Sequence, residues 1–344
     1  MKELTKGLIA LLVIIGISAG IYFYETMEER ILKTGDFAEI YYIGYFENGT
    51  VFDSSFQDNV SFDTPFNSKK YNLTPLKIYF GEGFPDDYPD GWSYSDIGAI
   101  KNMRIYEIKG LYEEIKGMKK GEEKIIEITP EKAFGRKVEN GTKFNTSMIF
   151  GYDEKFEIVN IKGVTVDLKW VCEEGEIITF PQYWYNIPVQ NPYWLWENAT
   201  EVISFNETHV VLKTTPNQLN NLTLFPWWEN ASSAGYNDTQ IYIETTPPLG
   251  NFTISYWGGY VTGKVVEVTE DKIKIEYMAG NQTIEDEINR TIFFNRSIEM
   301  PIIFKDIQKI SIEDDLRENG YSFHELAGKN VVFRIKLLKI YRLS

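Results

Sequence analysis

Few residues in this chain have the type and number that covalent or metal chemistry requires. His209 and His324 are its two histidines, so a zinc site built from several histidines is not expected. The single cysteine, Cys172, cannot form an intramolecular disulfide and is expected to be a buried apolar thiol. The carboxylates are scattered along charged turns, which indicates solvated surface rather than an acid-base pair. We therefore expect no metal and no small-molecule cofactor.

Aromatic side chains are the remaining groups that could form a binding site. The chain contains 22 Tyr, 22 Phe and 8 Trp, and aromatic residues gather beyond residue 150. Exposed at turns, such rings would form an apolar surface, whereas buried rings would be the core of a β-domain. Both interpretations apply to three clusters: Tyr183-Trp184-Tyr185, Tyr193-Trp194-Leu195-Trp196 and Phe225-Pro226-Trp227-Trp228.

Alternating apolar residues predict strands in the first third of the chain. Residues 37–46 are rich in β-formers and lead into an Asn-Gly turn at 48–49, which indicates a hairpin. Residues 76–80 alternate like another strand. The following segment, 82–106, is rich in Gly, Pro, Asp and Tyr and is expected to be a surface excursion.

One short helix is predicted next. Leu111, Ile115 and Met118 lie at i, i+4 and i+7, which forms one apolar stripe. Strands are predicted over 124–128 and, much later, over 330–340. This last strand needs a sheet to join.

Residues 151 to about 325 have the pattern of short strands separated by Asn, Gly and Pro turns. Segments 202–213 and 265–276 share a hairpin pattern, which suggests duplication of a small β-module.

The charge of the chain excludes one class of partner. The formal net charge is −15 and the isoelectric point is near 4.8. Phosphate contacts need clustered Lys and Arg, so nucleic acid is not an expected partner.

The amino terminus predicts a membrane segment. Residues 7–24 are uncharged and just long enough to cross a bilayer as one helix. Lysines precede this segment and glutamates follow it, which predicts a cytoplasmic tail over 1–6 and an extracytoplasmic remainder in a single-pass cell-membrane protein. A cleaved signal peptide is the alternative, because Ser18-Ala19-Gly20 is a small-residue site.

Asn-x-Ser/Thr triplets favour the same compartment, because glycosylation occurs on the outer side. The chain carries fourteen, which predicts a glycoprotein. The alternative is turn chemistry, since Asn, Ser and Thr are favoured at bends between strands.

Three separated blocks resemble the FKBP-type peptidyl-prolyl isomerases, and they occur in the family's order. The blocks run from Gly35-Asp36-Phe37 to Asp53-Ser54-Ser55, from Gly110-Leu111 to Ala133-Phe134-Gly135, and from His324-Glu325-Leu326 to Val332-Phe333. The third block is similar to the closing strand of the subgroup that carries a chaperone domain in its flap. The gap between Gly135 and His324 is what an enlarged insertion in the flap would produce.

The resemblance implies an apolar proline-binding pocket. Its catalytic candidates are Tyr42, Phe52, Asp53, Phe134 and Phe333, and its substrate-binding candidates are Leu76, Ile78, Ile108 and Leu111. Phe134 departs from the family, which usually has tyrosine there. The lost hydroxyl removes one hydrogen bond to the bound peptide, worth about 0.5–1.5 kcal/mol. His324 is expected to be structural.

Such a pocket needs no nucleophile, metal or acid-base pair. Rotation about an X-Pro bond meets a barrier near 20 kcal/mol because it breaks amide resonance. The twisted amide is less polar at its carbonyl oxygen, so a dry aromatic pocket favours it over the planar ground state. Asp53 could orient the carbonyl region electrostatically or through a buried network.

The fold class expected from all of this is α+β. An antiparallel FKBP-like sheet would wrap on the short helix over residues 33–150 plus 323–344, with 82–106 as a loop insertion. An all-β domain, possibly duplicated, would be inserted over 151–322, and residues 7–24 would be the membrane anchor.

The function implied is a peptidyl-prolyl cis-trans isomerase that acts as an extracytoplasmic foldase. Its partners would be unfolded or proline-containing polypeptides, bound by the insert, and the membrane through the N-terminal helix. The alternatives are a non-catalytic chaperone or cell-surface binding protein on an FKBP scaffold, and a purely structural envelope protein.

Overall fold

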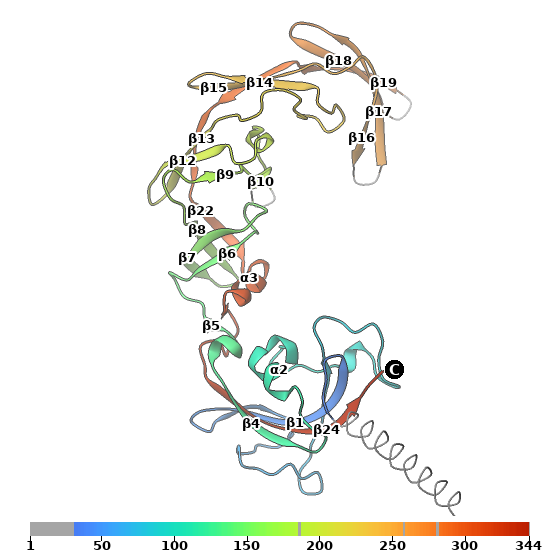
Figure 1. Cartoon of the computed structure of the whole chain (residues 1–344), viewed down its shortest axis with the longest axis vertical. Helices are drawn as coiled ribbons and strands as arrows, with labels where there is room; N and C mark the ends of the chain where they lie inside the picture. The colour runs from blue at the N-terminus through green and yellow to red at the C-terminus, as the bar shows by residue number, and fades with distance from the viewer. Residues whose placement is uncertain (1–30, 185–186, 257–258, 280–281, 344) are drawn as a thin grey trace, which may run out of the picture. The chain divides into compact units, whose positions relative to one another are not determined.

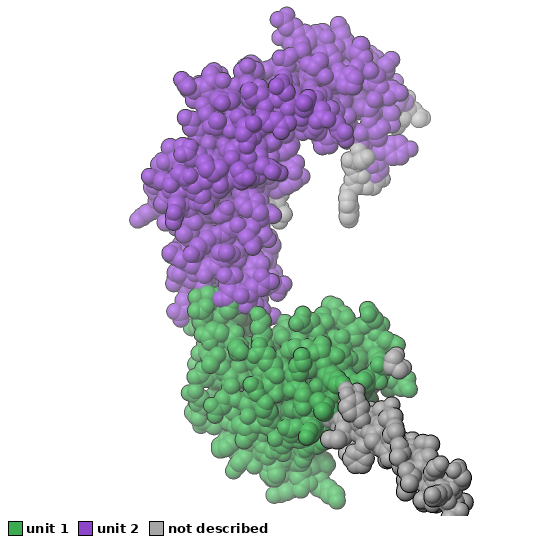
Figure 2. Space-filling view, viewed as in Figure 1, with its two compact units in different colours: residues 1–138, 320–344 green, residues 139–319 purple. Residues whose placement is uncertain are grey.

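The computed structural model describes residues 31–343 except 185–186, 257–258 and 280–281. The chain divides into two compact units, which are coloured separately in Figure 2. The first unit comprises residues 1–138 with 320–344, and the second comprises residues 139–319. The first unit is therefore discontinuous in sequence, and the chain returns to it after completing the second.

The first unit is built on one antiparallel sheet. Its strands are β1 (Asp36–Phe46), β2 (Val51–Ser54), β3 (Leu76–Phe80), β4 (Glu123–Ile128) and β24 (Val331–Tyr341). The order is β2-β1-β24-β4, and β3 pairs with the first half of β1. The last strand of the chain thus lies between the first strand and β4, as Figure 1 shows.

Helix α2 (Lys109–Ile115) packs on one face of this sheet through buried Leu111 and Ile115. A 3-10 turn, η2 (Ile105–Glu107), leads into it. Gly110 lets the helix approach β4, because a Cβ there would lie 2.5 Å from the Ile128 side chain.

The segment 82–106, which was predicted to be a surface excursion, is only partly exposed. Its first part is exposed, with a single 3-10 turn, η1 (Tyr94–Asp96). In its second part, Ile100, Met103 and Ile105 are buried in the same core cluster as α2 and the sheet. These apolar residues are separated by polar ones, so the sequence gives no periodic sign of their burial.

The second unit consists of short antiparallel sheets. The first has strands β6 (Lys143–Thr146), β7 (Glu154–Lys162), β8 (Thr165–Trp170) and β22 (Ile303–Gln308). The second has β9 (Ile177–Ile178), β12 (Thr200–Phe205), β13 (His209–Thr214) and β21 (Ser297–Pro301). The third has β14 (Ser232–Tyr236), β15 (Gln240–Thr245) and β20 (Thr291–Asn295). The fourth has β16 (Gly250–Tyr256), β17 (Gly259–Val268), β18 (Lys272–Ala279) and β19 (Gln282–Asn289).

Smaller elements complete the description. In the second unit these are the pair β10 (Tyr183–Trp184) and β11 (Ile187–Pro188), helix α3 (Glu313–Glu318), and the 3-10 turns η4 (Tyr193–Leu195) and η5 (Lys309–Ser311). In the first unit they are η3 (Pro130–Lys132) and the parallel pair β5 (Arg136–Lys137) and β23 (Tyr321–Ser322).

A common plan links the sheets of the second unit. Four hairpins, β7–β8, β12–β13, β14–β15 and β17–β18, occur in order along the outgoing chain. The returning chain then supplies β19, β20, β21 and β22, which pair in turn with β18, β15, β13 and β8. Each hairpin is therefore completed by one strand of the returning chain.

Two neighbouring hairpins, β12–β13 and β14–β15, each contain the same kind of buried side-chain contact. They resemble each other more than the two segments predicted from the sequence to be a repeat. Thr200 and Thr214 form a buried hydroxyl pair at 2.8 Å in β12–β13, and Ser232 and Thr245 form its counterpart at 2.9 Å in β14–β15. The sequences 197–200 and 229–232 read Glu-Asn-Ala followed by Thr or Ser.

Asparagine turns explain many of the Asn-x-Ser/Thr triplets, and the predicted glycosylation is not supported. The side-chain oxygens of Asn48, Asn206 and Asn237 each accept the backbone N–H of the threonine two residues on. Three more triplets have their asparagine at positive φ: Asn198, Asn221 and Asn230. Asn tolerates both arrangements, so the triplets encode turns.

The expected class, α+β with a membrane-spanning helix, is wrong for the part of the chain that the structure describes. That part is mostly β, and its two α-helices, α2 and α3, have seven and six residues. The predicted anchor, residues 7–24, lies outside the described residues. Within residues 31–343, no helix is long and apolar enough to span a membrane. A seven-residue helix extends about 10 Å, against roughly 30 Å of hydrocarbon.

The membrane partner and the extracytoplasmic location were expected from that segment and from the Asn-x-Ser/Thr triplets, and no membrane-spanning helix among the described residues supports them.

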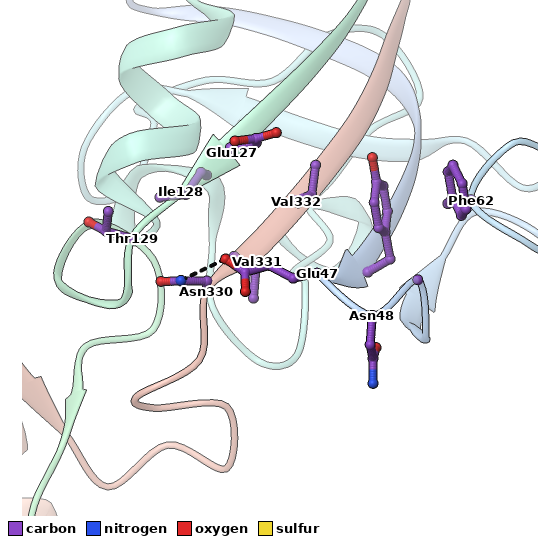
Figure 3. Close-up of a pocket in the computed structure, with 11 residues that line it drawn as sticks. Glu47, Asn48, Phe62, Glu127, Ile128, Thr129, Asn330, Val331 and Val332 are labelled. Atoms are coloured by element: carbon purple, nitrogen blue, oxygen red, sulfur yellow. Dashed lines mark hydrogen bonds between the residues drawn. The ribbon is translucent and has the colours of Figure 1, made fainter.

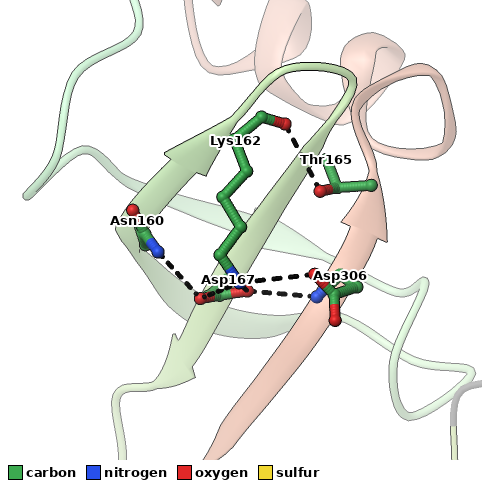
Figure 4. Close-up of polar contacts among 5 residues, drawn as sticks. All are labelled: Asn160, Lys162, Thr165, Asp167 and Asp306. Carbon is green, nitrogen blue, oxygen red and sulfur yellow. Dashed lines mark hydrogen bonds and ion pairs between the residues drawn. The ribbon is translucent and has the colours of Figure 1, made fainter.

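A buried carboxylate fixes the first sheet of the second unit (Figure 4). Asp167 on β8 accepts hydrogen bonds from the side chains of Lys162 at 2.9 Å and Asn160 at 3.1 Å, and from the backbone N–H of Asp306 at 3.1 Å. The partner strands β7 and β22 both shift register beside it. Asp167 thus holds two bulges with one side chain.

The pKa of the Asp167 carboxyl lies below its ordinary value. Burial alone would raise this pKa, but the hydrogen bonds from Lys162, Asp306 and Asn160 outweigh that effect. The contribution to stability is therefore present above the unfolded-state pKa, about 3.9, and is lost as the pH falls through the lower folded-state value.

We predict that Asp167→Asn lowers the free energy of unfolding of the second unit by about 2 kcal/mol at pH 7, because it removes charge-assisted hydrogen bonds. Urea unfolding of the full chain followed by tryptophan fluorescence measures this, since Trp92 is the one tryptophan outside residues 139–319. The matched control is Asp306→Asn, because the exposed Asp306 side chain has a single ion pair, with Lys162. Equal stability of the two variants would contradict the prediction.

Candidate functional site

Three aromatic rings from separate elements meet on the helix-facing side of the first sheet. Phe52 comes from β2, Phe134 follows η3, and Phe333 comes from β24. The Phe52 ring is nearly perpendicular to the other two, with centroids 6.1 Å from Phe134 and 5.7 Å from Phe333. Edge-to-face contacts of this kind favour a fixed arrangement of rings.

Gly44 on β1 makes this arrangement possible. A Cβ at this position would lie 2.6 Å from the Phe52 ring and 3.0 Å from the Phe333 ring. The strand therefore carries a glycine where the two rings lie against its backbone.

Below the rings lies an apolar floor. Ile78, Ile108 and Leu111 are buried in the same cluster as Tyr42, while Leu76 is half-buried beside it. The structure thus brings together the side chains that the resemblance assigned to the pocket, although they come from six segments between residues 42 and 333. The groups nearest solvent are Phe52, Asp53 and Leu76.

A carboxylate forms the polar edge of the site. The Asp53 carboxylate accepts hydrogen bonds from the backbone N–H groups of Ser54 at 2.9 Å and Lys101 at 3.3 Å. Burial, together with the nearby Asp53 carboxylate, raises the pKa of Tyr42 well above its ordinary value. The phenol is therefore an uncharged group beside the carboxylate.

Two further residues contact the site that the sequence did not assign to it. The imidazole of His324 stacks on Phe134, with centroids 4.7 Å apart and planes 15° apart. Its Nε2 lies 2.8 Å from the backbone oxygen of Lys101. From the sequence, we predicted a structural role for His324 and a surface loop around Lys101, so neither residue was assigned to the pocket.

The donor set does not indicate metal chemistry. Among the described residues, no group of three or more His, Cys, Asp or Glu side chains is arranged to hold a metal ion. The arrangement is instead a cluster of aromatic and aliphatic side chains beside a half-buried carboxylate.

A hollow of about 750 Å³ lies elsewhere on this unit (Figure 3). It is lined by Tyr45, Phe62, Val332 and the carboxylates of Glu47 and Glu127, among others. Tyr45 and Val332 point to the opposite face of the sheet from Tyr42 and Phe333, because neighbours on a strand alternate. The residues assigned to the proline pocket do not line this hollow. The candidate site is therefore the cluster of Phe52, Phe134 and Phe333 and not this cavity.

One family comparison concerns part of the first unit. Residues 101–158 match the model of the FKBP-type peptidyl-prolyl cis-trans isomerases. The matched stretch contains Ile108, Leu111 and Phe134, together with helix α2 and strand β4. Phe52, Asp53 and Phe333 lie outside it, and the structure brings them to the same site. Residues 101–158 are thus similar to the FKBP-type peptidyl-prolyl cis-trans isomerases.

Proposed function

We propose that the first unit isomerises X-Pro bonds of polypeptides in the pocket formed by Phe52, Phe134 and Phe333, beside Asp53. The observation that carries this proposal is the convergence of three aromatic rings, of which Phe52 is perpendicular to the other two, beside one carboxylate held by backbone N–H groups. The match to the isomerase family supports the same activity.

The geometry favours a twisted amide in two ways. The proline ring would enter the apolar cluster next to Phe52, where water is excluded and the polar planar amide is disfavoured. The fixed charge of Asp53 would repel the carbonyl oxygen more strongly in the planar state, where that oxygen carries more negative charge. Both effects act on the difference between ground state and transition state, which is what raises kcat.

The pocket residues should differ from exposed aromatic residues in their effect on activity. Asp53→Asn keeps the shape of the side chain but removes its charge, and we expect kcat/KM for a proline tetrapeptide to fall by about tenfold, equivalent to about 1.4 kcal/mol. Phe52→Ala should lower it at least as much, because a pocket wall is lost. Exchange NMR on the peptide measures the rate.

Phe62→Ala is the control for these variants, because Phe62 is exposed and lies against Tyr45 on the opposite face of the sheet. It should leave the rate unchanged. Catalysis by the wild-type chain no faster than the spontaneous reaction would refute the proposed activity.

We propose further that the second unit binds unfolded polypeptide and presents it to the pocket, as an insert in the flap of the isomerase unit. In the first predicted cluster Tyr183 is 52% exposed, but the other two clusters do not provide the surface, because Tyr193, Trp196 and Trp228 are buried at 1–3% exposure. Those rings form cores, for example around Trp228, Phe252 and Val265.

Exposed aromatic residues occur instead on the third sheet. Tyr242 and Phe293 are direct cross-strand partners on β15 and β20, with ring centroids 6.1 Å apart and exposures of 42% and 65%. Gly235 lies opposite Tyr242 on β14 and leaves room for its ring. An exposed pair of this kind can bind apolar segments of an unfolded chain.

Removing this pair should affect protein substrates alone. The double variant Tyr242→Ser/Phe293→Ser should raise KM several-fold for refolding of a proline-limited protein, because docking raises the effective concentration of substrate at the pocket. The rate with a tetrapeptide should not change. The control is Val164→Ser/Ile310→Ser, which removes two other highly exposed apolar side chains of the same unit. Equal effects of the two double variants would show that the pair has no specific role.

One observation favours a second function, that of a non-catalytic chaperone on the same scaffold. Phe134 and Phe333 are at most 1% exposed, and Phe134 lacks the hydroxyl that relatives use to bind peptide. The tetrapeptide assay separates the two functions, since a chaperone of this kind would suppress aggregation without accelerating isomerisation.

A further inference from the structure

A tight turn in the excursion lies beside the proposed pocket in an unusual conformation. Ile100 and Met103 exchange both backbone hydrogen bonds, at 2.9 and 3.0 Å, around Lys101 and Asn102. The φ angles of Lys101 and Asn102 are 49° and 67°. Turns of this kind favour glycine, and a lysine in the left-handed region is uncommon.

The surroundings hold the turn in this conformation. Ile100 and Met103 are 0% and 3% exposed and belong to the core cluster that contains Ile108 and Leu111. Backbone strain that persists because the packing imposes it is a feature of functional sites, and here both free backbone groups of Lys101 contact the site.

The backbone of Lys101 connects two parts of the pocket. Its N–H donates to the Oδ2 atom of Asp53 at 3.3 Å, and its carbonyl lies 2.8 Å from Nε2 of His324. The backbone N–H of Leu326 donates to Nδ1 of His324 at 3.1 Å, so Nδ1 is an acceptor and the ring proton is on Nε2. His324 therefore donates to Lys101, and its ring stacks on Phe134.

We propose that the turn at Lys101–Asn102 positions the proline pocket, by fixing the Asp53 carboxylate through its N–H and the Phe134 ring through His324. Lys101 and His324 act as positioning residues, and the inference rests on the proposed isomerase function. Asp53, Lys101 and His324 lie on three segments far apart in sequence, and this turn connects the first to the third. A pocket without an acid-base pair depends on such geometry, because a small displacement of a positioned group lowers the rate.

The ion pair between Lys101 Nζ and Glu325 Oε1, at 3.3 Å, lies at the same place but is a different interaction. The glutamate side chain is 66% exposed, so the pair contributes little. It provides the matched control, since Glu325→Gln removes the ion pair and leaves the turn and the imidazole in place.

Two variants of His324 separate its hydrogen bond from its stacking. His324→Phe keeps a ring against Phe134 and loses the donor to Lys101. His324→Gln keeps an amide N–H near the position of Nε2 and loses the ring. We expect His324→Phe to lower kcat for a proline tetrapeptide by about five- to tenfold, the effect of one lost hydrogen bond, with little change in KM. His324→Gln should also lower kcat, because it keeps a donor but loses the ring that holds Phe134. Glu325→Gln should match wild type within about twofold.

Three results would overturn the inference while leaving the isomerase function intact. The first is wild-type kcat in His324→Phe. The second is wild-type kcat in His324→Gln, which would show that the stacked imidazole does not hold Phe134. The third comes from the wild-type chain and does not depend on how variants fold: imidazole nitrogen shifts in the NMR spectrum that show the proton on Nδ1. An inactive wild-type chain would instead refute the proposed function, and the positioning role with it.

Discussion

The central position of β24 is the constraint on which the rest of the structure depends. This strand pairs with β1 along ten residues and with β4 on its other side, yet it is the last strand of the chain. The sheet of the first unit cannot be completed until the chain has returned from residues 139–319. Phe333 lies on this strand and His324 just before it, so the proposed pocket is completed by the same event. Pairing across so long a separation in sequence is entropically costly and favours slow folding.

The second unit also depends on the return of the chain, and it repeats one arrangement of strands. A chain that must leave a sheet and come back supplies two antiparallel passes, and here the outgoing pass forms hairpins while the returning pass adds one strand to each. The turns are encoded locally: Asn206 and Asn237 each bind the N–H of the residue two positions on. Each hairpin can therefore form from its own sequence, whereas the third strand has to wait for the return.

Local signals in the sequence predicted the elements that depend on local interactions. The alternation of β1, the Asn-Gly turn after it, the stripe of Leu111 and Ile115, and the last strand all appear as expected. The resemblance assembled residues that no periodicity could connect, such as Phe52 and Phe333. What the sequence could not show depends on tertiary contacts. The burial of Ile100 and Met103 has no periodic pattern, and the role of Lys101 is carried by its backbone, which is the same in every residue.

Composition alone left two interpretations of the aromatic clusters open, an exposed surface and a core. Burial assigns Trp196 and Trp228 to the core, whereas Tyr183 is exposed. The exposed pair of Tyr242 and Phe293 forms no run in the sequence, because the two residues lie on different strands and meet only across the sheet. A binding face on a β-sheet alternates with core positions, so it leaves no run of aromatic residues for the sequence to display.

A site of this kind also changes what limits its activity. In the proposed mechanism no proton has to move, so the pKa values of its groups would matter little beside the geometry of the rings. The proposed pocket would contact the X-Pro amide through its aromatic rings. The positions of these rings depend on Gly44, on the stacking of His324 and on the turn at Lys101. If the proposed function holds, residues that never touch a substrate set the rate as directly as those that do, because each of them fixes the shape into which the twisted amide must fit.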